Sequence, residues 1–371
     1  MVGMDVLNQS PGAQLAVVCD DLDAAVRFYT EQLGFRLDMI MPADAPRIAV
    51  ISGFGIFVRL QQHSALSDAQ AQQAATTLRL PRRLLPDSAA FDGKSAAPGN
   101  VLIEPVDEPC LGTAMPVIEA PTIKRADGNN EWSAGRAGMQ YRDLIPDRIG
   151  GCVIASQIRI EQGGPVDDYV HYHKVGLQLI YCRRGWVRVV YEDQGPPFVM
   201  QPGDCVLQPP TIRHRVLESS AGLEVIELGI PAEHETWRDH ELSLPTATVN
   251  PQRDFGGQRF VRHVASDAGW QDDVEGVVAI RDIGIDAATH QLASARVIQF
   301  RGTSDAQAVV AMPQTAFRFT FVLDGGVQLV PSRGNPVTLA TDDACILPTN
   351  GACSLQANAG AQLLDICVRA T

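Results

Sequence analysis

His171, His173 and His214 are the residues of this chain best suited to metal chemistry. Side chains alternate between the two faces of a β-strand, so the first two point to the same side and their ring nitrogens can converge. A third histidine arriving on another strand completes a set of three nitrogen donors. Such a set holds Fe, Mn, Ni, Cu or Zn and leaves coordination positions open for a substrate.

The residues around these histidines follow the spacing of one protein family. The first group is Gly164, His171, His173, Gln178 and Gly185, and the second is Gly203, Pro209 and His214. Their order resembles the two cupin motifs, with Thr211 in place of the inner glycine of the second motif. The resemblance covers residues 141–247 and implies a small jelly-roll β-barrel with the metal ion inside.

Gln178 stands where the cupin motif has a metal-binding glutamate. Three histidines and an amide leave a divalent ion fully dicationic, which favours a chelating anion such as an enolate, catecholate, diketonate or thiolate. Gln178 either binds the metal or only hydrogen-bonds a ligand. The alternative to a metal centre is that the three histidines are remnants in a metal-free binding barrel.

Three further residues are candidates for the substrate pocket. Cys182 lies at even spacing from Gln178 and so shares its strand face, and Gln208 can line the cavity. Arg213 precedes His214 and by alternation faces outward, towards acidic partners such as Glu218 or Asp168. If its guanidinium reached the mouth instead, it would hold a carboxylate with two hydrogen bonds.

The barrel sequence occurs twice. Residues 141–144 (YRDL) are echoed by 280–283 (IRDI), and residues 206–209 (VLQP) by 345–348 (CILP). A constant offset over several segments indicates a structural repeat and predicts a second barrel. Near the motif histidines this copy has Ala311, Met312 and Pro313, with Phe319 opposite Gln178 and Cys353 or Ser354 opposite His214. The second barrel is therefore expected to be a scaffold without metal.

The first sixty residues form a separate unit. An apolar strand at 15–19 precedes a helix capped by Asp20 or Asp21, and strands are expected at 35–40, 48–51 and 55–60. This order resembles one module of the vicinal oxygen chelate (glyoxalase) superfamily. The positions of that family's metal ligands hold Gln14, and Arg59 or Gln61. An arginine repels a cation, which predicts a metal-free packing or dimerisation module.

The segment after this module is the least regular. Residues 68–79 are expected to be helical, 91–100 a connector and 101–104 a strand, with Trp132 packing a glycine-rich loop against the barrel. The chain thus divides into a module at 1–62, a connector and cupin extension at 63–140, a metal-binding barrel at 141–247 and a degenerate barrel at 248–371. The expected fold class is mainly β: two cupin (jelly-roll-type) β-barrels preceded by a small α+β module of βαβββ order.

Composition limits the partners. A net charge of −13 and a pI near 5.0 argue against nucleic-acid and anionic-membrane binding. With no long apolar run and no basic-then-apolar start, a cytoplasmic protein is expected. The eight cysteines include no Cys-x-x-Cys pair and are expected to be buried and reduced. Both resembled families often pair, which predicts a homodimer.

The leading functional hypothesis is a non-haem Fe(II) dioxygenase that acts on a small chelating anion of the diketone, catechol or thiol type. Mn, Ni or Zn would suit the same nitrogens. The sequence identifies no dedicated general base. The alternatives are a metal-dependent isomerase or lyase of the cupin class, and a non-catalytic small-molecule-binding or sensor protein.

Overall fold

The computed structural model describes most of the chain. The described ranges are 14–32, 34–53, 56–62, 76–81, 95–97, 101–106, 117–126, 132–273, 276–301, 308–311, 317–332, 334–349 and 353–369. Contacts divide the chain into two units, residues 1–111 with 234–240, and residues 112–233 with 241–371. Among the described residues, none of the helices has the length and apolar character needed to span a bilayer.

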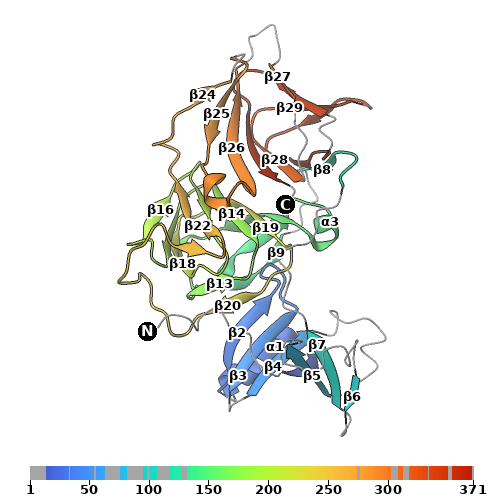
Figure 1. The fold of residues 1–371 in the computed structure, drawn as a ribbon, viewed down its shortest axis with the longest axis vertical. Coiled ribbons are helices and arrows are strands. Elements are labelled where there is room, and N and C mark those ends of the chain that lie inside the picture. The colour runs from blue at the N-terminus through green and yellow to red at the C-terminus, as the bar shows by residue number, and fades with distance from the viewer. Residues whose placement is uncertain are drawn as a thin grey trace. The chain divides into compact units, whose positions relative to one another are not determined.

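The first unit contains the predicted order of one strand, a helix and three strands. These are β1 (Gln14–Cys19), α1 (Leu22–Arg27) continued by η2 (Phe28–Gln32), β2 (Arg36–Met41), β3 (Ile48–Gly53) and β4 (Ile56–Gln62). The sheet order is β2-β3-β4-β1, with β1 parallel to β4 (Figure 1). The helix begins at the expected cap, because Asp21 accepts a hydrogen bond of 2.9 Å from the Ala24 amide.

Two local predictions in this unit are wrong. The last residues of the expected 68–79 helix belong to strand β5 (Thr76–Pro81), which pairs with β1; the other residues of that prediction lie outside the described ranges. The polar stretch after Pro231, with Glu233, His234, Glu235 and His240, predicts a helix-like segment, but its residues Thr236–Arg238 form strand β20, which pairs with β2. In both places pairing with an open strand edge decides the conformation. The strand expected at 101–104 is present as β7 (Val101–Val106), and β6 (Ser95–Ala97) pairs with it.

The first barrel consists of two facing sheets in the second unit. One sheet has the order β23 (Val261–His263), β17 (Cys205–Leu207), β14 (Leu177–Arg184), β19 (Leu223–Ile230), β11 (Ile154–Ile160), β10 (Gln140–Asp143) and β9 (Ser133–Ala134). The other contains β16 (Phe198–Met200), β15 (Val187–Tyr191), β18 (His214–Ser219), β13 (His171–His173) and β12 (Gly164–Pro165). Residues of both sheets, among them Val189, Tyr191, Cys182 and Val225, form one apolar cluster between them.

The second barrel repeats this plan. Its larger sheet has the order β24 (Gln271–Asp272), β25 (Val278–Asp282), β26 (Ala293–Phe300), β33 (Gln362–Val368), β28 (Phe317–Asp324), β31 (Ala344–Ile346) and β8 (Thr122–Lys124). Its smaller sheet contains β27 (Ala308–Ala311), β32 (Cys353–Ala357), β29 (Val327–Pro331) and β30 (Val337–Leu339). The predicted fold class, a mainly β chain with two jelly-roll-type units, is confirmed by this arrangement (Figure 1).

Alternation along β14 shows how the barrels meet. Leu179 and Tyr181 belong to a cluster shared with Phe319 and Phe321 of β28, whereas Cys182 belongs to the interior cluster of the first barrel. The two large sheets therefore pack back to back through one core. Gln178 and Cys182 lie on the opposite face of β14, towards the barrel interior.

Equivalent registers identify the counterparts of the site residues in the second barrel. Leu179 pairs with Leu207 and Leu228, and Phe319 pairs with Ile346 and Ile366. Phe319 is thus the counterpart of Leu179, and the expectation that it stands opposite Gln178 is wrong by one residue. Arg318 holds that position.

Candidate metal centre

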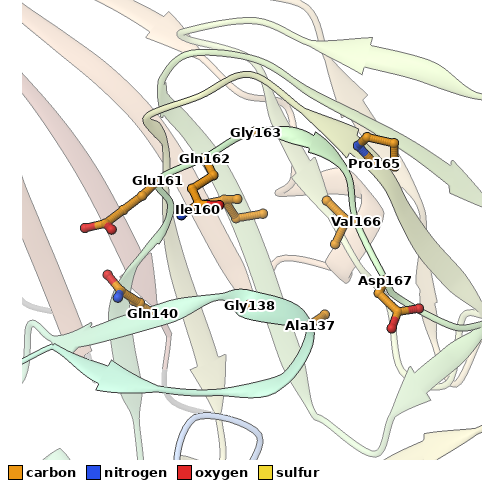
Figure 2. Close-up of a pocket in the computed structure, with 10 residues that line it drawn as sticks. All are labelled: Ala137, Gly138, Gln140, Ile160, Glu161, Gln162, Gly163, Pro165, Val166 and Asp167. Atoms are coloured by element: carbon orange, nitrogen blue, oxygen red, sulfur yellow. The ribbon is translucent and has the colours of Figure 1, made fainter.

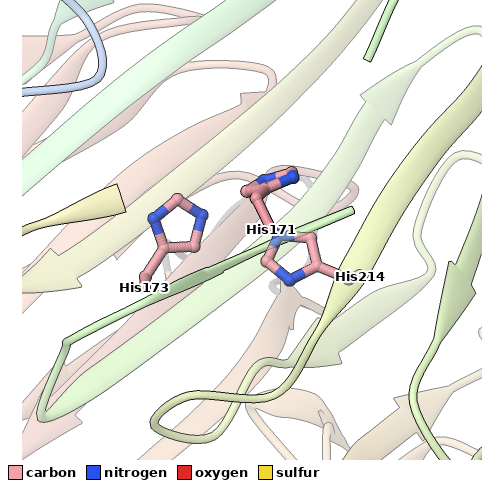
Figure 3. A group of neighbouring side chains, drawn as sticks. All are labelled: His171, His173 and His214. Atoms are coloured by element: carbon pink, nitrogen blue, oxygen red, sulfur yellow. The ribbon is translucent and has the colours of Figure 1, made fainter. Parts of the chain in front are cut away.

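Three imidazoles meet inside the first barrel. His171 and His173 lie on β13, and His171 pairs directly with His214 at the start of β18. The candidate ligand nitrogens all lie within 4.8 Å of one another, and the side chains are buried (Figure 3). Ring centroids are 4.2 Å apart for His171 and His214, 5.2 Å for His171 and His173, and 5.1 Å for His173 and His214.

Backbone carbonyls fix which ring nitrogen is free in two of the rings. His171 Nδ1 lies 2.8 Å from the Tyr169 carbonyl oxygen, and His214 Nδ1 lies 3.1 Å from that of Ile212. A carbonyl only accepts, so each Nδ1 carries the proton and donates it. The Nε2 lone pair of both rings is left for a ligand, which is the usual arrangement of metal-binding histidine.

Burial keeps these rings neutral. The pKa of His171 lies well below its usual value because of burial first, and then because of the positive charge of Arg136. Burial also lowers the pKa of His214 to about 4. Both imidazoles are therefore unprotonated near pH 7, and only that form binds a metal.

Arg136 is a functional neighbour that sequence reasoning missed. Its Nη2 lies 2.6 Å from His171 Nε2, and its Nη1 forms a buried ion pair with Asp168. Asp168 also accepts hydrogen bonds of 2.9 Å from the backbone amides of Tyr169 and Val216, so the carboxylate is held from several sides. Arg136 lies in a glycine-rich loop, where neither strand alternation nor a motif predicts which way a side chain points.

Gln178 is held by two side chains. Its Nε2 donates to Glu227 Oε1 at 2.6 Å, and its Oε1 accepts from Gln208 Nε2 at 3.0 Å. Gln208 Oε1 in turn accepts from the hydroxyl of Tyr191, whose ring stacks on His214 at 5.4 Å. A directed chain of donors thus runs from the ring beside His214 to the buried carboxylate of Glu227.

Glu227 is the second residue that the sequence did not indicate. It lies on β19, in register with Ile180 of β14 and Ser156 of β11, so by alternation it shares the interior face with Gln178. The hydroxyl of Ser156 is buried without a hydrogen-bond partner. A carboxylate is therefore present inside this barrel, on a different strand from the one that carries it in the cupin motif.

The other two pocket candidates lie apart from the imidazoles. Cys182 belongs to the apolar cluster of the barrel, its Sγ donates to the Gly185 carbonyl at 3.6 Å, and burial raises the pKa of its thiol to about 12. Arg213 lies over the Tyr172 ring at 4.4 Å and donates to the Thr211 carbonyl at 3.2 Å. Of the acidic residues expected near it, Asp168 pairs with Arg136, and Glu218 pairs with Arg188.

A pocket of about 480 Å³ is lined by residues that are neighbours in sequence of Arg136 and Asp168 (Figure 2). It is lined by Ala137, Gly138, Gln140, Ile160, Glu161, Gln162, Gly163, Pro165, Val166 and Asp167. Ala137 follows Arg136 in the chain, and Asp167 precedes Asp168, so the two walls carry the partners of the ion pair. The sequence-predicted site residues do not line this pocket.

The second barrel has a different polar pair at the matching positions. Asp365 is in register with Thr320, just as Glu227 is in register with Ile180. Arg318 forms a buried ion pair with Asp365, with 3.0 Å between Arg318 Nε and Asp365 Oδ1. Pro331 pairs with Cys353 as Tyr191 pairs with His214, which places Cys353 at the histidine position. Within the described ranges, the three histidines are the one group of three or more side chains placed to hold a metal.

The donor set fits a divalent ion, with one feature opposing it. Three buried imidazoles suit Fe, Mn, Ni or Zn. The guanidinium of Arg136 already uses the free nitrogen of His171, so this cation must move before a metal can bind there. Fold and site together define a mainly β protein with a three-histidine centre in one of two barrels.

Comparisons with known proteins identify structural neighbours only. No family model and no curated protein matches the sequence. A mutant of Bacillus subtilis oxalate decarboxylase OxdC is 10% identical, with 65% of this chain and 75% of that chain covered and a TM-score of 0.48. The oxalate decarboxylase of the same organism at pH 4.6 is 10% identical, with 70% of this chain and 77% of that chain covered and a TM-score of 0.49. The formate complex of Lactobacillus farciminis oxalate decarboxylase is 12% identical, with 65% of this chain and 84% of that chain covered and a TM-score of 0.48. The fold described above rests on this chain's own strand order and registers.

Proposed function

We propose that this protein is a metal-dependent enzyme of the cupin type, and that it acts as a non-haem Fe(II) dioxygenase. Its substrate would be a small chelating anion of the diketone, catechol or thiol class. The observation that carries the proposal is the convergence of three buried imidazoles, with backbone carbonyls holding Nδ1 of His171 and His214 so that Nε2 carries the lone pair in both rings. Mn, Ni and Zn suit the same donors.

His171, His173 and His214 would hold the ion. When bound, the ion supplies Lewis-acid and redox chemistry at positions open to substrate. The surrounding side chains would exclude water, since the three histidines are buried and Tyr191 of the apolar cluster stacks on His214. Gln178 is fixed by Glu227 and Gln208, so its amide presents a constant hydrogen-bonding surface to a bound anion.

Glu227 is the group in this interior suited to take a proton from the substrate. Its carboxylate accepts from Gln178, and an ionised carboxylate has further acceptor sites. In this proposal Gln178 positions the substrate and Glu227 holds the released proton. Gln208 and Tyr191 keep the amide of Gln178 oriented.

A second candidate is a metal-free or sensor-type binding barrel. The observation that favours it is the contact between Arg136 and His171 Nε2, which puts an internal cation where a metal ligand bond would form. A metal-dependent isomerase or lyase remains the competing enzyme class, because the same three donors serve Lewis-acid chemistry.

Metal analysis and oxygen uptake separate these candidates. The protein would be loaded anaerobically with Fe(II) and assayed with a panel of diketones, catechols and thiols. Oxygen uptake that His171→Ala abolishes and that the exposed-site control His290→Asn retains supports the dioxygenase. Bound metal with substrate turnover but no uptake favours the isomerase or lyase. Failure of the protein to retain any metal favours the binding barrel.

The N-terminal unit is proposed to be a metal-free module related to the vicinal oxygen chelate fold. Its element order and the parallel β1–β4 pair support this proposal. Arg59, at one position expected for a ligand, is buried on β4. The protein is further proposed to be a cytoplasmic homodimer, and light scattering of the purified chain would test the dimer.

A further inference from the structure

Arg136 places a buried cation against a metal-binding nitrogen. The side chain is 12% exposed, and its Nη2 lies 2.6 Å from His171 Nε2. The other nitrogen of this ring donates to the Tyr169 carbonyl. His171 Nε2 therefore accepts a hydrogen bond from Arg136 through its single lone pair.

That lone pair cannot serve two partners. A metal–nitrogen bond and an N–H···N hydrogen bond need the same electrons, so a metal can reach His171 only after the guanidinium has left. The two cations would also repel each other across a short distance in a buried site. Arg136 and a metal ion are thus competitors for one nitrogen.

The ion pair with Asp168 holds the competitor in place. Asp168 is itself fixed by the amides of Tyr169 and Val216, so Arg136 meets a carboxylate whose position is already set. Asp168 Oδ1 also lies 3.6 Å from His171 Nδ1. Once the arginine has left, this carboxylate can offset the charge on a metal-bound His171.

The structure provides room for the arginine to move. Arg136 opens the short turn η6 (Arg136–Gly138), and the next two residues line the 480 Å³ pocket. Ala137, next to Arg136, is held in the left-handed region at φ 53°, a strained conformation that movement of the turn could relieve.

We propose that Arg136 is an autoinhibitory group that occupies the His171 ligand position, so that a divalent metal binds only by displacing it. This inference rests on the proposed metal-dependent function and deepens it. Metal affinity is then set by competition as well as by the three donors. The protein in which Arg136 contacts His171 Nε2 is a resting form without metal. Binding of a metal ion is coupled to movement of the turn at residues 136–138.

Metal titration of an arginine variant tests this proposal without any substrate. Binding of Mn²⁺ to metal-free protein would be measured by calorimetry for the wild type, Arg136→Met and Arg188→Met. The last variant removes an exposed arginine that pairs with Glu218 outside the site, and so controls for the loss of one positive charge. Arg136→Met is expected to bind Mn²⁺ at least tenfold more tightly than the wild type, and Arg188→Met to match the wild type.

A change of less than tenfold in Arg136→Met, or weaker binding, overturns the proposal while leaving the metal centre intact. Absence of binding in both proteins, or binding that survives His171→Ala, overturns the metal centre itself.

A second readout does not depend on the folding of Arg136→Met. In wild-type protein labelled with ¹⁵N-arginine, saturating Zn²⁺ is expected to shift the Nε–H signal of Arg136, assigned by its loss in Arg136→Lys. An unchanged signal at full Zn²⁺ occupancy contradicts displacement.

Discussion

A buried carboxylate is paired with a side-chain N–H donor at equivalent positions of the two barrels. Gln178 donates to Glu227 in the first barrel, and Arg318 forms an ion pair with Asp365 in the second. In each pair the buried acid lies on the central strand of the large sheet, β19 or β33, and its donor lies on the neighbouring strand, β14 or β28. A buried acid without a donor is costly, so removing the donor from either pair should destabilise its barrel apart from any chemistry.

Replacing Gln178 with glutamate restores the cupin motif and tests this pairing. Gln178→Glu faces Glu227 with a second carboxyl group and removes its donor, which should cost about 1–3 kcal/mol of unfolding free energy without metal. Urea denaturation at pH 7 measures the loss. The swapped pair Gln178→Glu with Glu227→Gln is the control and should recover part of it. Equal stability of wild type and single variant would show that the pair contributes nothing.

Cys182 gives a prediction from a pKa shift. Burial first, and then the nearby charge of Asp204, raise the pKa of this thiol to about 12. A raised pKa leaves the thiol protonated at pH 8, and the protonated form is not nucleophilic. Native protein should therefore show the same number of thiols reacting rapidly with Ellman's reagent as Cys182→Ala, whereas unfolded protein should show one more. A rapidly reacting thiol that Cys182→Ala removes would contradict the burial.

Only some residues of the candidate site could be predicted from the sequence. Strand alternation and the motif spacing indicated His171, His173 and His214, and the structure brings all three together. Glu227 and Arg136 could not be predicted in the same way. The first depends on the register between strands far apart in the sequence, and the second on the conformation of a loop.

At the scale of elements, turns between strands decide where the histidines lie. The Thr211 amide donates to the His173 carbonyl at 3.0 Å, which ties the turn before His214 to the end of β13. Thr211 adopts φ 63°, in the left-handed region where the cupin motif has glycine. A β-branched residue is strained in this region. Thr211 therefore adopts the backbone conformation expected of a glycine at this position, although the residue itself is different.

Thr211→Gly should therefore stabilise the protein. Relief of the left-handed strain is worth about 1–2 kcal/mol, against about 0.5–1 kcal/mol of added chain entropy in glycine. The net gain in unfolding free energy should be about 0.5–1 kcal/mol, measured by urea denaturation. Gly185→Ala is the opposite control, since φ is +69° and the new Cβ would lie 2.3 Å from Ser220 Oγ. A loss of stability in Thr211→Gly would show that the threonine is not strained.

Helices and strands could be predicted where apolar and polar residues alternate along a buried strand. They could not be predicted where pairing with a distant strand determines the conformation of a segment. The helix cap at Asp21 and the strands of the first unit follow from local signals. Strand β5 overrides an Ala- and Gln-rich composition because it pairs with β1. The one-residue error at Phe319 arose because repeat alignment ignores loop lengths, whereas the pairing with Ile366 fixes the register.

At the scale of the whole molecule, the described part of the second unit depends on the core between its two barrels. Phe317, Phe319 and Phe321 of β28 pack in one cluster with Leu177, Leu179 and Tyr181 of β14. The strand that carries Gln178 is therefore supported from behind by the barrel that lacks the three-histidine group. This support is a reason to keep a second barrel in whose described residues no group of three metal donors is found.

Phe319→Ala tests this dependence. Truncation of a fully buried phenylalanine should cost about 3–5 kcal/mol of unfolding free energy and destabilise both barrels in one transition. Calorimetry, with Val249→Ala at an exposed position as control, measures the change. Two separate transitions, of which only one is lowered, would show that the barrels do not share a core.

The central claim is that three imidazoles of the first barrel hold one divalent ion. Elemental analysis after loading with Fe(II) and extensive anaerobic dialysis tests it most directly, comparing the wild type with the variant in which His171, His173 and His214 are all alanine. The account predicts about one iron per chain in the wild type and none in the folded triple variant. Iron retained equally by both proteins, or by neither, would contradict it.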